Sequence, residues 1–488
     1  MDIQGNIKRI TSNVNFENLI KIVALAVFFI FSLYQVLTHV PFFDEVNAWN
    51  IAAYLKPSEI FEITRHEGHL FIWYFILKPF AQNDLWYPYS MQIINWLFAF
   101  GAILLLWYYS PFNTITKMFI TFSLPVKVFY IHARCYSIGI FLLFLLCVLY
   151  KNRLKHPICY SILLVLIANT SIMAGILAFS LGLCFIYDLS RGKSENIITN
   201  KDILLSVGIC LVGAVVVILQ LCNFSIPYYS NQTFDYGKHL MQFYLRDYDQ
   251  ILPFLLLFCH LWLLILAWKF FEKNKLPFIF LSLSTYVCLF LFLNIYRSSF
   301  WHFMFLFLAL IISMWMYLSE YKINDNFQKR YYAVFTILFV LLTFYQYKGE
   351  VVGAQSAILD YLQNSGGIYK NHKIFMYPTD SSVIGIVPIL QKENYLFYDC
   401  LGNSYKSVEL YRHQWDTPKV DFDKMLGMLK NGETAYVFVS VARPHELMNE
   451  NFSDYVTIYK HKNKNVNIKL LKREYNVFIW ELTKNKSF

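Results

Sequence analysis

Charged residues are scarce in this chain of 488 residues. Only 15% of the residues are Asp, Glu, Lys or Arg, whereas 57% are hydrophobic and 19% are aromatic. A soluble domain carries about 25% charged residues. This scarcity excludes a soluble enzyme, a disordered scaffold and a collagen-like fibre, and it indicates that a bilayer is the solvent for most of the chain.

The sequence also lacks a disulfide framework. Eight of the nine cysteines, from Cys135 to Cys288, lie in or beside apolar segments, where Cys behaves as a small hydrophobic residue. Only Cys400 lies in the polar C-terminal part, so that part has no internal disulfide. No pair of cysteines has the spacing of zinc ligands. The pattern excludes a small disulfide-stapled domain.

The net charge is +10, because 42 Lys and Arg residues exceed 32 Asp and Glu residues. Such a balance is compatible with a nucleic-acid partner. In a membrane protein it more simply reflects a basic cytoplasmic face, as the positive-inside rule describes. We therefore expect no nucleic-acid partner.

Apolar runs predict about 11 transmembrane helices, since a span needs about 20 mostly apolar residues. No small-residue cleavage site follows the first run, so we interpret it as a retained helix rather than a signal peptide. The predicted spans are 18–38, 88–109, 113–131, 134–150, 157–170, 171–188, 203–222, 251–271, 277–296, 300–318 and 331–347.

The basic residues between these spans predict the orientation. With the N-terminus in the cytoplasm, Lys and Arg concentrate in every second loop, for example at Lys151, Arg153 and Lys155. The apolar stretch His69–Phe80 would break this alternation if it spanned, so we expect it to lie on the outer leaflet or to dip into it. The chain would then divide into a transmembrane domain, 1–348, with a first outside loop, 39–89, and an extracytoplasmic domain, 349–488.

The C-terminal part has a different character. Amphipathic runs at 354–363 and 420–429 alternate with β-rich runs at 373–377, 435–440 and 475–481. This alternation predicts a small α/β domain. The sequence of this part contains no glycine-rich phosphate loop, nucleophile elbow or metal cluster, so a lid or docking role is favoured over a second active site.

Two adjacent carboxylates, Asp44 and Glu45, follow the first span. Paired acids at a membrane surface are costly to desolvate and repel each other, which favours a functional role. Asp44 would act as a general base or a metal ligand. The alternative is that Asp44 caps the helix that begins there.

The same outside loop contains Arg65, His66, Glu67 and His69. His66 and His69 are three residues apart, but Gly68 interrupts a continuous helix and the spacing does not match a zinc site. Hydrogen bonding to a sugar or phosphate, or packing at a turn, is favoured over metal binding for these residues.

Arginines lie at the outer ends of two spans. Arg134 begins the fourth span, and Arg297 lies in an outer hairpin that also contains His302. A guanidinium at this depth suits a lipid phosphate, which it binds through two parallel hydrogen bonds. The alternative is that each arginine only extends its side chain to the membrane surface and contacts lipid headgroups without selecting one. The loop 223–250 adds Lys238, His239, Arg246, Asp247 and Asp249 as a substrate rim or a solvated face.

In this order along the chain, these elements resemble the GT-C superfamily of integral-membrane glycosyltransferases. The resemblance is to its family 39-type branch, which includes protein O-mannosyltransferases and lipid A aminoarabinose transferases, and within it to an uncharacterised bacterial group. It covers about the first 320 residues. The motifs are Asp44-Glu45 with Ala48-Trp49 and Ile51-Ala52, Glu67-Gly68-His69 with Trp73-Tyr74, Met91–Asn95, Ala133-Arg134 with Tyr136-Ser137, Ala168–Thr170, and Arg297–Phe305.

The resemblance implies an inverting transfer of a sugar from a polyprenyl-phosphate donor at the extracytoplasmic face of a bacterial inner membrane. It makes Asp44 the base and Arg134 a candidate phosphate ligand, and Glu45 would support the base or help to hold a metal. It implies no certain cofactor, and a divalent metal (Mg or Mn) stays open. Many relatives have a second acidic motif in the next outside loop, whereas residues 126–134 contain no carboxylate. Glu67 would then substitute.

Two other functions stay open. A transporter or flippase of a lipid-linked sugar would use the same arginines without requiring Asp44, although the sequence shows no internal repeat of the kind common in transporters. A non-catalytic subunit of a surface-glycan assembly complex would use the C-terminal domain to bind a partner. The acceptor, whether a glycan, a lipid or a protein, is not predicted by the sequence.

Overall fold

A computed structural model gives the structure of this chain. It describes residues 3–41, 43–83, 85–221, 252–294, 300–344, 367–377, 395–399, 420–440, 466–474 and 477–484, together with a few single residues between 362 and 456. The chain forms two compact units. The first comprises Met1–Leu37, Pro57–Trp73 and Gln92–Tyr347, and the second comprises Thr38–Lys56, Tyr74–Met91 and Lys348–Phe488.

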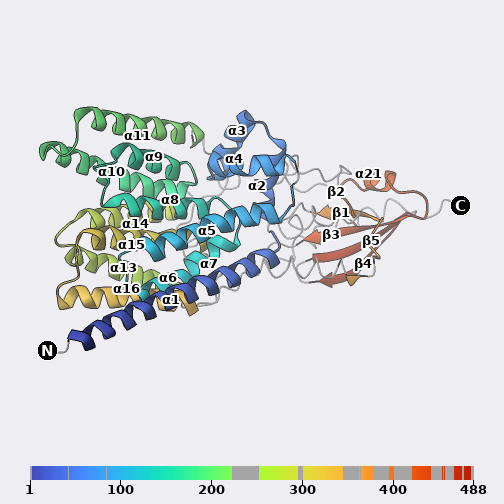
Figure 1. Cartoon of the computed structure of the whole chain (residues 1–488). Helices are drawn as coiled ribbons and strands as arrows, with labels where there is room; N and C mark the ends of the chain where they lie inside the picture. Colours follow the sequence, from blue (N-terminus) through green and yellow to red (C-terminus); the bar gives the residue numbers. More distant parts are fainter. Residues whose placement is uncertain are drawn as a thin grey trace. The chain divides into compact units, whose positions relative to one another are not determined.

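The first unit is helical, and most of the described residues in each predicted span lie in helices (Figure 1). The helices that lie wholly or mostly in this unit are α1 (Ile3–Thr38), α3 (Pro57–Glu67), α5 (Tyr89–Tyr109), α6 (Thr114–Phe122), α7 (Leu124–Ile131), α8 (Tyr136–Tyr150), α9 (Pro157–Ala168), α10 (Ile172–Ser194), α11 (Asn200–Leu221), α13 (Leu252–Phe270), α14 (Leu276–Asn294), α15 (Phe300–Glu320) and α16 (Asn326–Phe344).

Within the described residues, five helices are long and apolar enough to cross a membrane, and α6 with α7 would make a sixth span as a bent pair. The five are Phe16–Thr38, Tyr89–Tyr109, Ile172–Ser194, Asn200–Leu221 and Trp301–Glu320. Other predicted spans are shorter apolar helices, among them α8 and α9. The protein is therefore a polytopic α-helical membrane protein.

The third predicted span, 113–131, is broken. Ser123 has an extended backbone between α6 and α7, and the two helices meet at 43°. Pro125 explains the break, because it has no backbone N–H to donate to the carbonyl of Thr121 and its ring would clash with that carbonyl in a continuous helix. At the end of α6 the carbonyl of Ile120 accepts a hydrogen bond from Ser123 Oγ at 2.7 Å.

Helix α15 forms the centre of the first unit. Its residues from Met304 to Tyr317 are almost all inaccessible to solvent, and it packs against α7, α8, α10 and α14. A helix that is apolar on every side is expected at the middle of a bundle. His302 lies near the first residue of α15 and Glu320 is its last residue. The same buried helix therefore positions both of these polar side chains.

A buried ion cluster joins three elements near Glu320. Arg153, in the turn after α8, donates to Asp188 of α10 at 2.6 and 3.1 Å and to Glu320 at 2.6 Å. Its guanidinium also stacks on the Tyr150 ring at 3.9 Å. Burial alone would lower the pKa of Arg153, but the hydrogen bond and charge of Asp188 raise it above its ordinary value.

Replacing Arg153 with Ala should lower the free energy of unfolding by about 3–5 kcal/mol, because Asp188 and Glu320 would lose the cation that compensates their buried charges. Denaturant titration in mixed micelles measures this change. The matched control is Arg191→Ala, which removes an exposed pair with Glu195 and should leave stability almost unchanged. Equal stability of the two variants would show that the cluster contributes nothing.

The C-terminal part of the second unit is an α/β domain, as the sequence predicted. In the described residues its sheet has the order β2-β1-β3-β5-β4, with parallel pairing from β2 to β3 and antiparallel pairing beyond. The elements are β1 (Lys373–Tyr377), β2 (Leu396–Asp399), α21 (Phe422–Gly427), β3 (Thr434–Ser440), β4 (Val466–Glu474) and β5 (Val477–Lys484).

Helix α21 closes the core of this domain. Phe422, Met425 and Leu426 pack against buried side chains of β1, β3, β4 and β5, among them Val437 and Leu482. Most of the predicted helix 354–363 lies outside the described residues.

Candidate functional site

The turn between α7 and α8 is fixed by a buried asparagine. Asn95 of α5 donates its Nδ2 hydrogens to the carbonyls of Phe129, Tyr130 and His132, at 3.0, 3.1 and 3.1 Å. These carbonyls lie at the end of α7, where the helix leaves its last C=O groups without intrahelical partners. The turn that carries Arg134 is therefore held in place by α5.

The segment from Gly68 to Leu70 is hydrogen-bonded to the hairpin between α9 and α10. Gly68 has φ +68°, a conformation that favours glycine, and it ends α3 as the sequence indicated. Its carbonyl accepts from Ile172 N at 3.1 Å, while Leu70 N donates to the carbonyl of Thr170 at 3.2 Å. His69 and Ser171 thus form an antiparallel bridge, which brings His69 into the first unit's interior.

His69 contacts both Arg134 and Cys135. Its Nε2 is hydrogen-bonded by the Arg134 guanidinium, and its Nδ1 lies 3.1 Å from Cys135 Sγ. Because arginine only donates, Nε2 must be the acceptor, and a neutral His69 then carries its proton on Nδ1. Burial, followed by the charges of Arg134 and His302, holds the pKa of His69 well below its ordinary value of 6.5. The bond to His69 therefore leaves the positive charge of Arg134 intact.

Two further side chains complete this group. Tyr136 Oη lies 3.0 Å from His302 Nε2, and the Arg134 guanidinium lies 5.7 Å from the centre of the Tyr136 ring. His69 also meets the edge of that ring, at 5.5 Å between centroids. We call these five buried residues the arginine cluster: His69, Arg134, Cys135, Tyr136 and His302.

The depressed pKa of His69 predicts an acid-sensitive fold. As pH falls below 6.5, the unfolded chain binds a proton at His69 that the folded chain does not, so stability falls until the folded pKa is reached. His69→Gln keeps a neutral acceptor for Arg134 but does not titrate. We expect the wild type to lose more thermal stability than this variant between pH 6.5 and pH 5. Parallel stability curves for the two proteins would contradict the assignment.

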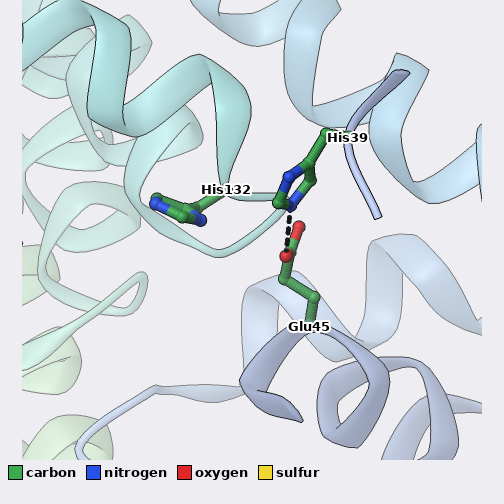
Figure 2. Close-up of side chains that lie close together, drawn as sticks. All are labelled: His39, Glu45 and His132. Carbon is green, nitrogen blue, oxygen red and sulfur yellow. Dashed lines mark hydrogen bonds and ion pairs between the residues drawn. The ribbon is translucent and has the colours of Figure 1, made fainter. Parts of the chain in front are cut away.

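The acidic pair lies in the second unit, in the first turn of α2 (Phe43–Tyr54). Glu45 is inaccessible to solvent and its Oε2 lies 2.7 Å from His39 Nε2 (Figure 2). Asp44 is half-buried. Because α2 already begins at Phe43, Asp44 is inside the first turn rather than at the capping position. The helix dipole favours a carboxylate there.

Helix α2 is held by a lysine that our sequence interpretation missed. Lys78 of α4 (Phe71–Ala81) donates from Nζ to the carbonyls of Ala52, at 3.3 Å, and Leu55, at 2.5 Å. These groups lie at the C-terminal end of α2, where a cation is favourable. The sequence signal was a single Lys within an apolar run. Helix α4 is 11 residues long, about 16 Å, and so is too short to cross a hydrocarbon core of about 30 Å.

The remaining candidates lie outside what the structure describes. The backbone of Arg65, His66 and Glu67 forms the end of α3, but their side chains lie outside the described residues, as do Arg297 and the loop 223–250. Of the predicted site residues, the structure brings together His69, Arg134 and His302 in the first unit. It adds Cys135 and Tyr136, which the sequence did not single out as site residues.

No protein-family model and no curated protein sequence matches this chain. Solved structures do. The crystal structure of ArnT from Cupriavidus metallidurans in the apo state matches with a TM-score of 0.51 and 11% identity, covering 96% of this chain and 98% of ArnT. The structure of the same protein bound to undecaprenyl phosphate matches with a TM-score of 0.49 and 9% identity, covering 94% and 97%. The apo structure shows that the fold of this chain is similar to that of ArnT, as the resemblance to this group of proteins implied.

Proposed function

We propose that this protein is an inverting glycosyltransferase that moves a sugar from a polyprenyl-phosphate donor to an acceptor at the extracytoplasmic face of a bacterial inner membrane. The observation that carries the proposal is the arginine cluster, which keeps a charged guanidinium buried within a GT-C fold. His69 and Tyr136 hold this guanidinium in a fixed place while it keeps its charge. A phosphate is the partner that a guanidinium suits best.

Arg134 would bind the phosphate of the donor. When the bond between the sugar and the phosphate breaks, negative charge develops on the phosphate oxygen that leaves. A cation fixed in advance in a water-poor site stabilises that charge strongly. His69 fixes one edge of the guanidinium without neutralising it, so Arg134 is a positioned and still charged group.

Asp44 would take the proton of the acceptor hydroxyl. The deprotonated oxygen then attacks the anomeric carbon from the face opposite the phosphate, and the electron pair of the breaking C–O bond goes to the phosphate. The product therefore has an inverted anomeric configuration. Asp44 is half-buried, whereas Glu45 is fully buried, which favours Asp44 as the base and Glu45 as a supporting residue held by His39.

No step of this reaction needs a divalent metal ion. Mg²⁺ prefers oxygen ligands and near-octahedral geometry, whereas one Glu45 oxygen is paired with the His39 imidazole. This pairing fits Mg²⁺ poorly, and imidazole is a more usual ligand for Zn, Cu or Fe. In the proposed reaction the positive charge at the phosphate comes from Arg134.

Proteoliposomes test the proposal against a transporter of a lipid-linked sugar. Polyprenyl-phosphate sugars would be placed in one leaflet, and both their covalent fate and their leaflet would be followed, with candidate glycan, lipid and protein acceptors present. A transferase yields a glycosylated acceptor and free polyprenyl phosphate. Exchange between leaflets without cleavage would establish a transporter, and neither change with every donor would favour a non-catalytic subunit.

A further inference from the structure

Strand β4 is the last strand of the C-terminal sheet, and within the described residues it pairs only with β5. An edge strand of this kind can pair with another chain, and proteins commonly prevent this with charged residues or a bulge. Strand β4 has both. Lys469, Lys472 and Arg473 lie within it, and its register shifts between Leu470 and Lys472.

Protection of the edge does not explain the two leucines at this bulge. Leu470 and Leu471 are 44% and 41% exposed, whereas their neighbour Ile468 is 1% exposed and belongs to the core of the domain. Exposed apolar residues on an edge strand increase the risk of pairing with another chain, so they work against the charges beside them. An exposed apolar pair with basic residues on both sides has the composition of a segment that lies at a membrane surface.

The part of the chain that includes β4 is strongly basic. Residues 460–484 contain seven Lys and Arg residues and two Glu residues, which gives a formal charge of +5, half of the net charge of the whole chain. Lys469 pairs with Glu481 at 3.0 Å, and the value of +5 already counts that carboxylate. Strand β2, at the opposite edge of the sheet, contains Asp399 and no Lys or Arg. A partner of the β4 edge is therefore expected to be negatively charged.

A lipid surface is within reach of this domain. The segment Phe16–Thr38 of α1 is long and apolar enough to cross a membrane, and the second unit begins at Thr38. The unit that contains β4 is therefore attached covalently to the end of a membrane-spanning helix. This attachment gives the domain a high effective concentration beside the bilayer, so a surface contact that would be weak for a separate protein is sufficient to hold it.

We propose that the β4 edge docks on an anionic phospholipid surface, with Leu470 and Leu471 among the headgroups and the basic residues of β4 beside the lipid phosphates. The phosphates supply the negative charge that complements the basic segment, and the boundary of the acyl region accepts the leucines. A soluble acidic glycan would match the charge but would offer no apolar layer for the leucines. This contact does not depend on sugar transfer, and it would hold the C-terminal domain against the membrane.

Photo-crosslinking at position 470 tests the contact. The full-length protein, with benzoylphenylalanine in place of Leu470 or Leu396, would be illuminated in nanodiscs of phosphatidylglycerol and phosphatidylcholine in equal amounts. Leu396 is the matched control, because it is 42% exposed on β2, at the opposite edge of the same sheet. We expect lipid adducts at position 470 to exceed those at position 396 by about fivefold or more, with phosphatidylglycerol preferred. Equal yields at the two positions, or equal capture of the two lipids at position 470, would overturn the proposal.

Removal of the charge tests the role of the basic residues. In the protein with the crosslinker at position 470, Lys469→Gln, Lys472→Gln and Arg473→Gln would be combined. Each basic residue near an anionic surface contributes about fivefold to binding, so we expect the yield of phosphatidylglycerol adduct to fall by about fivefold or more. The control, Lys424→Gln, removes an exposed lysine from α21 of the same domain and should leave the yield unchanged. Thermal unfolding checks that each variant is folded, and an unchanged yield in the folded triple variant would contradict the proposal.

Discussion

Replacing Asp44 with Asn is expected to lower the rate of sugar transfer by about 10²–10⁴-fold, the contribution typical of a general base. Asn has nearly the same shape as Asp but cannot accept the proton of the acceptor hydroxyl. The carboxylate is half-buried in the first turn of α2, and its removal leaves the buried pair of His39 and Glu45 intact. Single-turnover kinetics with saturating donor measures the chemical step.

The control for Asp44→Asn is Glu62→Gln, which removes an exposed carboxylate from α3 of the same outside loop. We expect this control to transfer at the wild-type rate. Thermal unfolding should show that both variants are folded. Full activity of the Asp44→Asn protein would remove Asp44 as the base, and the search would move to Glu67.

Replacing Arg134 with Ala should weaken donor binding by about 2–5 kcal/mol, as for other losses of one partner from a buried, hydrogen-bonded charge pair. This corresponds to an increase in Kd of roughly 30-fold to several thousand-fold. Arg134 is 8% exposed, so a phosphate without this partner would remain in a water-poor site. Binding of undecaprenyl phosphate to nanodiscs measures the change without depending on transfer.

Arg134→Lys separates the charge from the geometry. Lysine keeps the positive charge but loses the planar fork that binds a phosphate and His69 at fixed angles. We expect an intermediate loss of affinity in a folded protein. Unchanged affinity in a folded Arg134→Ala variant would contradict the assignment and move the phosphate site to Arg297 or the loop 223–250.

Apolar length predicted the helices well because burial in lipid depends on composition over about 20 residues. The same reasoning could not place the break at Ser123, where a single proline two residues on decides the backbone. It also used Arg153 only as one of the basic residues of a cytoplasmic loop, whereas the structure buries it between Asp188 and Glu320. Partners that are 35 and 167 residues away leave no local signal in one sequence.

The candidate site shows the same limit. Asp44 and Glu45 stand out because adjacent acids beside a membrane span are rare, and Arg134 stands out for its place at the end of one. The contacts of His69 with Arg134 and Cys135 join residues 65 and 66 positions apart, and they depend on the α9–α10 hairpin that receives His69. Strand β4 was missed for another reason: Lys469, Lys472 and Arg473 lie within it, and charges of this kind are typical of edge strands.

The most direct test of the central claim is the release of polyprenyl phosphate. Wild-type protein in nanodiscs would receive a panel of polyprenyl-phosphate sugars with candidate acceptors, beside the Asp44→Asn variant. Release by the wild type alone is the predicted result, and it would identify the donor. Equal release by both proteins would contradict Asp44 as the base, and binding of every donor without release by the wild type would contradict the transferase itself.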